Sequence, residues 1–162
     1  MELKKKFKKI GFIFGLKREM KLVSQKNNNI ICVYGYGKAS KNAAKELIKF
    51  GVDIVINFGF AGSISKSLKN GDIVFVDNLF NEKKEKLSTL KLDEDFLRNL
   101  ENGFKFFKSN LLTVNKIVAD KEEKLNLAKK FKSISVIDME AFYIRKELIK
   151  AKIPMISIKV IF

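Results

Sequence analysis

The carboxylates best placed for chemistry lie in the segment VIDMEA, residues 136–141, where a run typical of a strand passes into a run typical of a helix. Asp138 and Glu140 are therefore candidates for a reaction that depends on acidic side chains. The same two residues also suit helix capping, with Asp138 at the cap and Glu140 in the first turn. From this segment alone, capping is the stronger interpretation.

Three glycine-bearing turns form a second group of candidates, because each follows an expected strand. They are GFIFGLKRE at 11–19, YGYGKAS at 34–40 and NFGFAGS at 57–63. Glycine allows close backbone approach, and a strand end followed by a helix presents N–H groups to an anion or a sugar. Ligands of open α/β sheets bind at such edges. Gly35 and Gly37 lack the third glycine of a dinucleotide fingerprint, so the turns indicate a small-molecule site without naming its ligand.

Several kinds of chemistry are excluded by composition. The chain has no histidine, which removes Ser-His and Cys-His pairs, zinc sites built on histidine and His-ligated haem. Its one cysteine, Cys32, stands in the apolar run IICVYG and is interpreted as a buried hydrophobic residue. We therefore expect no metal site and no cofactor, and a reaction carried by carboxylates, amides, hydroxyls, backbone groups or lysines.

The chain is strongly basic, with 33 Lys and Arg against 18 Asp and Glu, a net charge of +15. Nucleic-acid binding depends on such charge. Only Arg18, Arg98 and Arg145 are arginines, however, and the lysines are spread along the chain rather than gathered in one stripe. We expect non-specific attraction to polyanions and no specific nucleic-acid partner.

Residues 1–15, MELKKKFKKIGFIFG, have a basic start and a short apolar run but no small-residue cleavage site. No apolar run approaches the roughly twenty residues that span a bilayer. We expect no membrane span and a cytoplasmic protein.

Short apolar runs alternate with amphipathic ones along the chain. Strands are predicted at 10–14, 30–34, 52–58, 72–76, 111–114, 135–137 and 155–162, and helices at 39–50, 121–132 and 139–152. Residues 81–108 are the least regular and are interpreted as a surface excursion with a helix around 93–107. This order predicts an α/β three-layer sandwich around a mixed, largely parallel sheet, in a single domain over residues 1–162.

Four segments in this order resemble the purine nucleoside phosphorylase superfamily, and in particular its methylthioadenosine/S-adenosylhomocysteine nucleosidase branch. IGFIFGLKREM resembles an IGIIGAMEEEV-type opening, and YGYGKASKNAAKELI is similar to a SGIGKVNAA segment. VINFGFAGSISKSLKNGDIVF resembles INTGTAGGLxxxLKxGDIV, and VIDMEAFYIRKELIKAKIPMISIKVI is similar to VEMEAAAIAxxCxxxxxPFxxxRAI. Residues 111–131, LLTVNKIVADKEEKLNLAKKF, resemble the hopanoid-associated phosphorylases of the same superfamily.

The resemblance implies cleavage of the N-glycosidic bond of a purine nucleoside, by water or by phosphate. It implies that Glu19 activates the attacking water and that Met139 and Glu140 line the ribose, with Glu140 accepting hydrogen bonds from its hydroxyls. Phosphorolytic members tend to carry an arginine where Glu19 stands, which favours hydrolysis, while the neighbouring Arg18 keeps phosphorolysis open. The remaining residues that the resemblance assigns are Gly59, Phe60, Ala61, Gly62 and Val118 for substrate binding, and Gly35 and Gly37, with Arg18, for a phosphate or water loop.

Two departures from the family pattern affect the expected activity. Phe60 replaces a small hydroxyl-bearing residue, which favours a bulkier or more apolar substrate. The Asp that protonates the leaving purine in the family would follow Phe162, and the family's last helix would follow that Asp. We therefore expect either a fragment or a short form with impaired catalysis that still binds nucleosides; if the chain is fully active, Asp138 is the first alternative proton donor. The resemblance and the fifteen phenylalanines also predict a homodimer.

Overall fold

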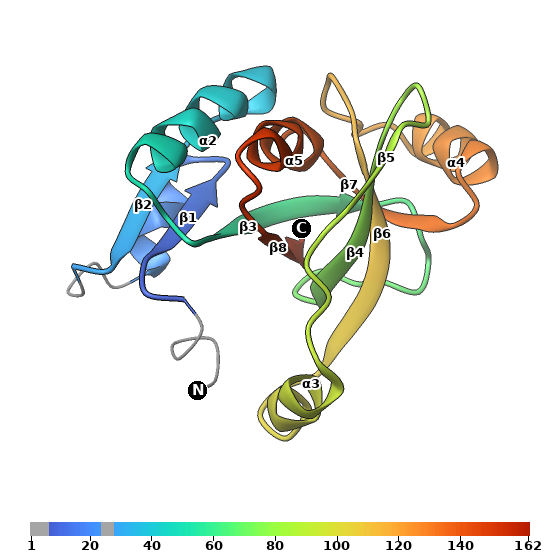
Figure 1. The fold of residues 1–162 in the computed structure, drawn as a ribbon. Coiled ribbons are helices and arrows are strands. Elements are labelled where there is room, and N and C mark those ends of the chain that lie inside the picture. Colours follow the sequence, from blue (N-terminus) through green and yellow to red (C-terminus); the bar gives the residue numbers. More distant parts are fainter. Residues whose placement is uncertain (1–6, 24–27) are drawn as a thin grey trace.

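A mixed eight-stranded sheet and four α-helices make up the part of the chain that the computed structural model describes, residues 7–23 and 28–162 (Figure 1). The basic segment 1–6, considered above as part of a targeting signal, lies outside the described residues. The strands are β1 (Ile10–Phe14), β2 (Ile30–Tyr34), β3 (Ile54–Ser63), β4 (Ile73–Asn81), β5 (Lys86–Ser88), β6 (Phe106–Thr113), β7 (Ile134–Asp138) and β8 (Met155–Ile161). The α-helices are α2 (Ser40–Lys49), α3 (Glu94–Glu101), α4 (Lys121–Lys130) and α5 (Ala141–Lys150), and two short 3₁₀ helices are η1 (Lys17–Leu22) and η2 (Gly37–Ala39).

The first three long strands form a parallel layer with β1 in the middle. Ile10 pairs with Ile30 of β2 on one side and with Ile54 of β3 on the other. Because the strands run in parallel, the segments that follow β1 and β2 lie at the same edge of the sheet. These segments carry η1 and η2, and therefore Glu19 and Gly37.

The second half of the sheet closes on itself. Strand β3 pairs in parallel with β8, β8 pairs antiparallel with β4, β4 and β6 are parallel, β6 and β7 are parallel, and β7 returns antiparallel to β3. These five strands therefore form a closed ring, which removes two edges of the sheet from solvent. Across this ring, Asp138 at the end of β7 meets Lys159 in the middle of β8.

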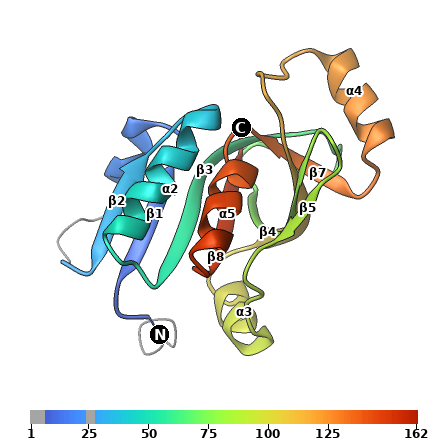
Figure 2. The same cartoon turned by 45° about the horizontal axis from the view of Figure 1, so that its top comes forward.

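Helices α2 and α5 pack against each other over one face of the sheet (Figures 1 and 2). Both are amphipathic, and their inner faces bury Ala43, Ala44 and Leu47 from α2 and Ile144 and Leu148 from α5. The two alanines leave little side chain between the helix and the strands, so α2 can lie close to β1 and β2.

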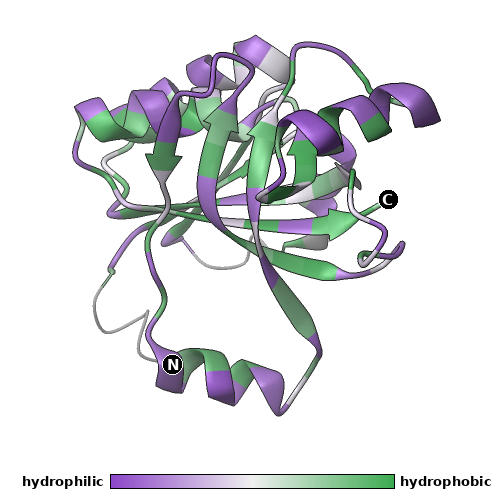
Figure 3. Cartoon of the chain, turned by 90° about the vertical axis from the view of Figure 1, so that its right-hand side faces the viewer, coloured by the Kyte–Doolittle hydropathy of each residue, from purple (hydrophilic) through white to green (hydrophobic). Residues whose placement is uncertain are grey.

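The other helices lie at the periphery. Helix α3 lies on the far side of the sheet from α2 and α5, with Leu97 buried and Leu100 packed against the cluster of Ile54, Phe75 and Ile156. Figure 3 shows mainly hydrophobic strands and helices in which hydrophilic and hydrophobic residues alternate. The α/β class and the mixed, largely parallel sheet agree with the sequence-based prediction. None of the helices within the described ranges is long and apolar enough to cross a membrane.

The predicted turn at 57–63 is wrong, because β3 continues through it to Ser63. Residues Asn57 to Ala61 pair with Ser157 to Ile161 of β8, and Gly62 pairs with Ile137 of β7. The long-range pairing partners fix this segment as a strand. The glycines here serve close packing, since a Cβ atom at Gly62 would lie 3.1 Å from Ile137 Cγ1.

The segment 81–108 contains more structure than predicted. Helix α3 begins as expected, with Asp93 capping Phe96 N at 2.7 Å, but it ends at Glu101 rather than near 107. Strand β6 starts at Phe106 because it pairs with Ile73 of β4, five residues before its predicted start. The sequence-based prediction also missed β5, which completes a hairpin with the end of β4.

Candidate active site

Glu140 lies between the end of β7 and the first residue of α5 and is only 7% exposed. Its Oε1 accepts a hydrogen bond from the Gly37 backbone N at 2.9 Å, and its Oε2 accepts one from the Met139 backbone N at 3.2 Å. The carboxylate does not cap α5, where it occupies the N-cap position without a side-chain capping bond. The capping interpretation is therefore wrong for Glu140, which reaches across to the loop after β2.

Glu19 lies in η1, just beyond the end of β1, and is 3% exposed. Its Oε2 accepts from the Leu16 backbone N at 2.8 Å, and its Oε1 accepts from the Phe60 backbone N at 3.2 Å. The first bond holds the carboxylate against its own turn, and the second ties it to β3. Backbone donors on two different elements thus fix the orientation of this side chain.

Gly15 lies next to both carboxylates, Glu19 and Glu140. A Cβ atom at this position would lie 3.6 Å from Glu19 Oε2 and 3.7 Å from Glu140 Cδ. Gly59 has a related role on the other side of Glu19, where a Cβ atom would lie 3.2 Å from Oε2 and 3.3 Å from Oε1. Small residues therefore leave room for two buried acidic groups that are far apart in the sequence.

The pKa of Glu140 is raised above the usual value of a glutamate. Burial is the largest cause, because it penalises the charged form, and the negative charge of Asp138 adds to it. The positive charge of Lys159 and the two backbone N–H donors oppose this shift. Glu140 therefore takes up a proton at a higher pH than an exposed glutamate does.

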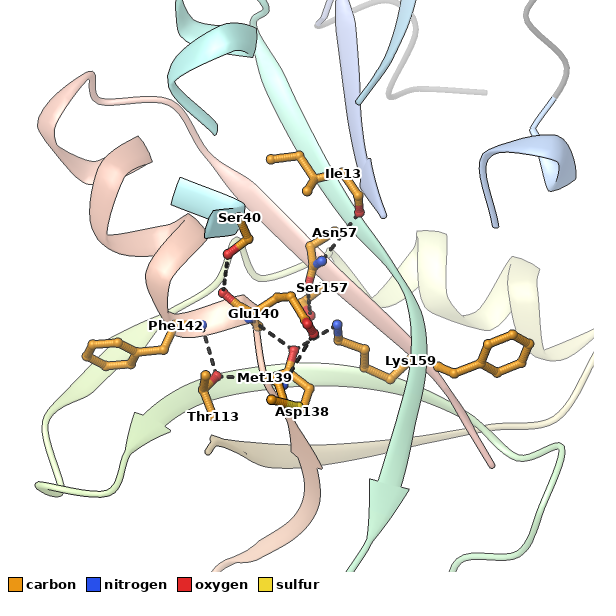
Figure 4. Close-up of polar contacts among 12 residues, drawn as sticks. Ile13, Ser40, Asn57, Thr113, Asp138, Met139, Glu140, Phe142, Ser157 and Lys159 are labelled. Atoms are coloured by element: carbon orange, nitrogen blue, oxygen red, sulfur yellow. Dashed lines mark hydrogen bonds and ion pairs between the residues drawn. The ribbon is translucent and has the colours of Figure 1, made fainter. Parts of the chain in front are cut away.

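Asp138 has a different environment, although it is only two residues away. Its Oδ1 accepts from the Thr113 hydroxyl at 2.7 Å, and its Oδ2 accepts from the Ala141 backbone N at 3.0 Å and lies 2.9 Å from Lys159 Nζ (Figure 4). The side chains of the ion pair are 0% and 2% exposed for Asp138 and Lys159. Asp138 lies two residues before the N-cap position, which Glu140 occupies, so its predicted place at the cap is wrong. Its side chain nevertheless accepts from the N–H of Ala141, the first residue of α5.

Two of the predicted substrate-binding residues, Val118 and Met139, belong to the same apolar region. Val118 is buried in a cluster with Leu112 and Ile137, against which Met139 packs. The Met139 sulfur accepts a hydrogen bond from the Tyr36 hydroxyl at 3.2 Å, which links the β7–α5 turn to the loop after β2.

The loop after β2, which contains Gly35 and Gly37, and strand β3 contribute mainly backbone groups to the site. Gly37 has φ +55°, in the left-handed region, and Gly35 has no room for a side chain because a Cβ atom would lie 2.7 Å from Ser40 Cα. Phe60 donates its backbone N–H to Glu19 and is 42% exposed as a residue, whereas Ala61 is buried. Arg18 is exposed, and the structure does not bring it into contact with the carboxylates.

A cavity of about 440 Å³ lies on the α2 side of Gly15. Its lining includes Gly15, Gly35, Tyr34, Tyr36 and Asn42 but neither Glu19 nor Glu140, so Gly15 is the residue that the cavity shares with the surroundings of the two carboxylates. The volume is within the range of small-ligand sites.

Three residues of this arrangement were not predicted: Gly15 as the contact point of the carboxylates, and Thr113 and Lys159 as partners of Asp138. A lysine in the otherwise uncharged strand MISIKVI was the available signal for the last of them, because an isolated buried cation needs a counter-charge. The described residues contain no group of three or more acidic or cysteine side chains arranged to hold a metal ion.

Comparison with known proteins agrees with this fold. Residues 5–161 match the family described as the phosphorylase superfamily. The chain belongs to the phosphorylase superfamily. Among curated proteins, the 5'-methylthioadenosine/S-adenosylhomocysteine nucleosidase of Buchnera aphidicola is 28% identical over 201 residues, covering 98% of this chain and 79% of that protein.

Solved structures of other superfamily members share the fold. The methylthioadenosine/S-adenosylhomocysteine nucleosidase of Neisseria meningitidis, in complex with methylthio-immucillin-A, has a TM-score of 0.81 at 18% identity, covering 95% of this chain and 85% of that chain. The futalosine hydrolase of Helicobacter pylori has a TM-score of 0.80 at 22% identity, covering 95% of this chain and 84% of that one. At this level of identity the likeness establishes the phosphorylase-like fold.

Proposed function

We propose that this member of the phosphorylase superfamily binds an adenosine-type purine nucleoside and cleaves its N-glycosidic bond with water. The observation that carries the proposal is the pair of buried carboxylates, Glu19 and Glu140, held on either side of Gly15 by backbone donors. A glycosidic carbon that acquires positive charge in the transition state is stabilised by such oriented negative groups.

In this proposal Glu140 binds the ribose. A carboxylate has about four acceptor directions, and the Gly37 and Met139 N–H groups occupy two of them. The remaining lone pairs can accept hydrogen bonds from two ribose hydroxyls. Such charge-assisted bonds fix the sugar and strengthen as its ring flattens toward an oxocarbenium ion.

Glu19 activates the attacking water. Its carboxylate is buried and oriented from two sides, so a water molecule hydrogen-bonded to it would be held in a defined direction and could lose its proton to it. The water oxygen then bonds to the sugar carbon as the bond from that carbon to the purine breaks, and the departing purine takes up a proton from solvent. A buried anion is a poor neighbour for phosphate, since like charges in a low-dielectric site repel strongly. Arg18, which could otherwise bind phosphate, is exposed. Both observations favour hydrolysis over phosphorolysis.

The test is release of free adenine from methylthioadenosine and from adenosine, measured with and without inorganic phosphate. The proposal predicts release that is independent of phosphate, with free ribose or methylthioribose as the second product. Release that requires phosphate and yields the sugar 1-phosphate would assign phosphorolysis instead. Saturable nucleoside binding without any release would assign the non-catalytic alternative, a nucleoside-binding relative.

A further inference from the structure

Lys159 is a cation in an unusual place. It lies in the middle of β8, in the closed ring of strands, and only 2% of its surface is exposed. Lysine is almost never buried unless it is paired, and here its partner is Asp138 at 2.9 Å. A buried ion pair of this kind is often no more stabilising than two apolar residues of the same volume. Stability alone therefore does not explain the pair.

The pair is connected to the turn that carries Glu140. Asp138 accepts from the backbone N of Ala141, and the Thr113 hydroxyl, which donates to Asp138, accepts from the backbone N of Phe142 at 3.0 Å (Figure 4). The first two N–H groups of α5 are thus held by one small network. Glu140 is the residue just before them, so the network fixes the direction in which its side chain leaves the backbone.

We propose that Lys159 is a positioning residue for Glu140: by neutralising Asp138 it keeps the turn in place and keeps the Glu140 carboxylate ionised for binding ribose hydroxyls. The inference rests on the proposed function, in which the ionised form of Glu140 is the form that binds. Lys159 acts through Asp138 and does not touch the nucleoside.

The charges around Glu140 support this role. The titratable groups that face it are Glu19 from η1, Asp138 from β7 and Lys159 from β8, while the loop at η2 provides the Gly37 N–H and an exposed lysine, Lys38. Lys159 is therefore the one buried cation among these groups. Without it, the negative charge of Asp138 would no longer be offset, and the pKa of Glu140, already raised by burial and by Asp138, would rise further.

The two single variants at the ion pair should shift the pH dependence of nucleoside binding in opposite directions. Glu140 binds as the anion, so binding is lost as the pH falls through its pKa. Lys159→Met removes the cation and should move this loss to higher pH. Asp138→Asn removes the anion and leaves the cation, so it should move the loss to lower pH. A network that only supported the fold would impair binding in the same direction in both variants.

The experiment follows the side-chain carboxyl ¹³C signal of Glu140 by NMR from about pH 4 to about pH 9, in the unmodified chain and in four variants. They are Lys159→Met, Asp138→Asn, the double variant and Lys159→Arg. We expect the midpoint to rise in the first, to fall in the second, and to stay near that of the unmodified chain in the double variant and in Lys159→Arg. Unchanged midpoints, or shifts of the same sign in both single variants, would overturn the inference.

If Lys159→Met does not fold, Asp138→Asn and the double variant still decide the matter, because the inference requires a lower midpoint in the single variant than in the double one. Nucleoside affinity, measured in parallel at about pH 6, should fall about tenfold in Lys159→Met and should recover at higher pH. Because the NMR midpoint needs no ligand, it reports on the positioning role even if the unmodified chain fails to bind nucleosides, which would be a failure of the proposed function alone.

Discussion

Asp138 and Glu140 are two carboxylates separated by one residue, and the fold treats them in opposite ways. Asp138 is held by a lysine, a hydroxyl and a backbone N–H, so protein groups surround both of its oxygens. Glu140 is held by two backbone N–H groups alone and lies beside Gly15 and Glu19. Burial alone therefore does not distinguish a structural acid from a functional one. The type and number of its partners do, because a carboxylate with spare acceptor capacity can still bind a ligand.

The largest expected effect concerns Glu19, which, like Glu140, is a buried carboxylate beside Gly15 that accepts from two backbone N–H groups. Glu19→Gln keeps the size of the side chain but removes the base that would take a proton from water. We expect turnover to fall by about 10²–10⁴, with nucleoside affinity changed little. Steady-state kinetics of adenine release and equilibrium binding measure the two quantities separately.

The matched control is Glu101→Gln, a carboxylate exposed at the end of α3 on the far side of the sheet. It should leave turnover unchanged. An equal loss of turnover in both variants, or no loss in Glu19→Gln, would show that Glu19 takes no part in the reaction.

The main effect of Asp138→Asn should be a lower free energy of unfolding, not a change in the reaction itself. It leaves Lys159 buried without its counter-charge, and breaking a buried pair in this way costs about 3–5 kcal/mol of unfolding free energy. Replacing both partners, as in Asp138→Asn with Lys159→Met, should recover much of that loss. Urea unfolding measures all three proteins, and a double variant less stable than both single ones would contradict the assignment of the pair.

Glu140→Gln should weaken nucleoside binding and leave stability nearly unchanged, the reverse of what we expect for Asp138→Asn. The neutral amide is a weaker acceptor for ribose hydroxyls, so nucleoside affinity should fall by about 10- to 100-fold, the equivalent of a charged hydrogen bond of about 1.5–3 kcal/mol. The melting temperature should stay close to that of the unmodified chain, because the raised pKa of Glu140 means that its charge is already disfavoured by burial.

The variant should also lose the decline in affinity that the unmodified chain shows as the pH falls through the Glu140 pKa. Titration calorimetry at several pH values checks both points. Equal affinity together with a lowered melting temperature would return Glu140 to a purely structural role.

Gly59→Ala should give the smallest effect. The added Cβ would lie 3.2–3.3 Å from the Glu19 carboxylate oxygens, so the side chain must move by a few tenths of an ångström. We expect a loss in turnover of about tenfold or less, since small displacements of a catalytic group have graded costs. Gly15→Ala is the comparison, because its Cβ would meet Glu19 at an ordinary contact distance of 3.6 Å yet would occupy the space between the two carboxylates.

Much of the fold could be predicted from the sequence, because most elements are set by local patterns. The strands Ile10–Phe14 and Ile30–Tyr34 were predicted at their observed bounds, and α2 within one residue at each end. The predictions went wrong where distant segments decide the structure. Gly59 and Gly62 look like turn residues in isolation, but pairing with β8 and β7 extends β3 through them.

The same reason limits the prediction of the site. The family resemblance identified Glu19 and Glu140 as site residues. Only the parallel arrangement of β1 and β2, together with the position of β7, brings them to Gly15. The opposite environments of Asp138 and Glu140 could not be read from VIDMEA, since both residues fit a helix start. Lys159, which distinguishes them, lies on another strand and becomes their neighbour only when the ring of strands closes.

Glu140, unlike Asp138, has acceptor capacity left for a sugar, and a crystal structure of the chain with a non-hydrolysable adenosine-type nucleoside would show whether the sugar uses it. We expect the ribose hydroxyls within hydrogen-bond distance of the Glu140 carboxylate, with Glu19 facing the glycosidic carbon and Asp138 still paired with Lys159. A nucleoside bound elsewhere, or one bound here with both Glu140 oxygens still contacting only Gly37 and Met139, would contradict this expectation.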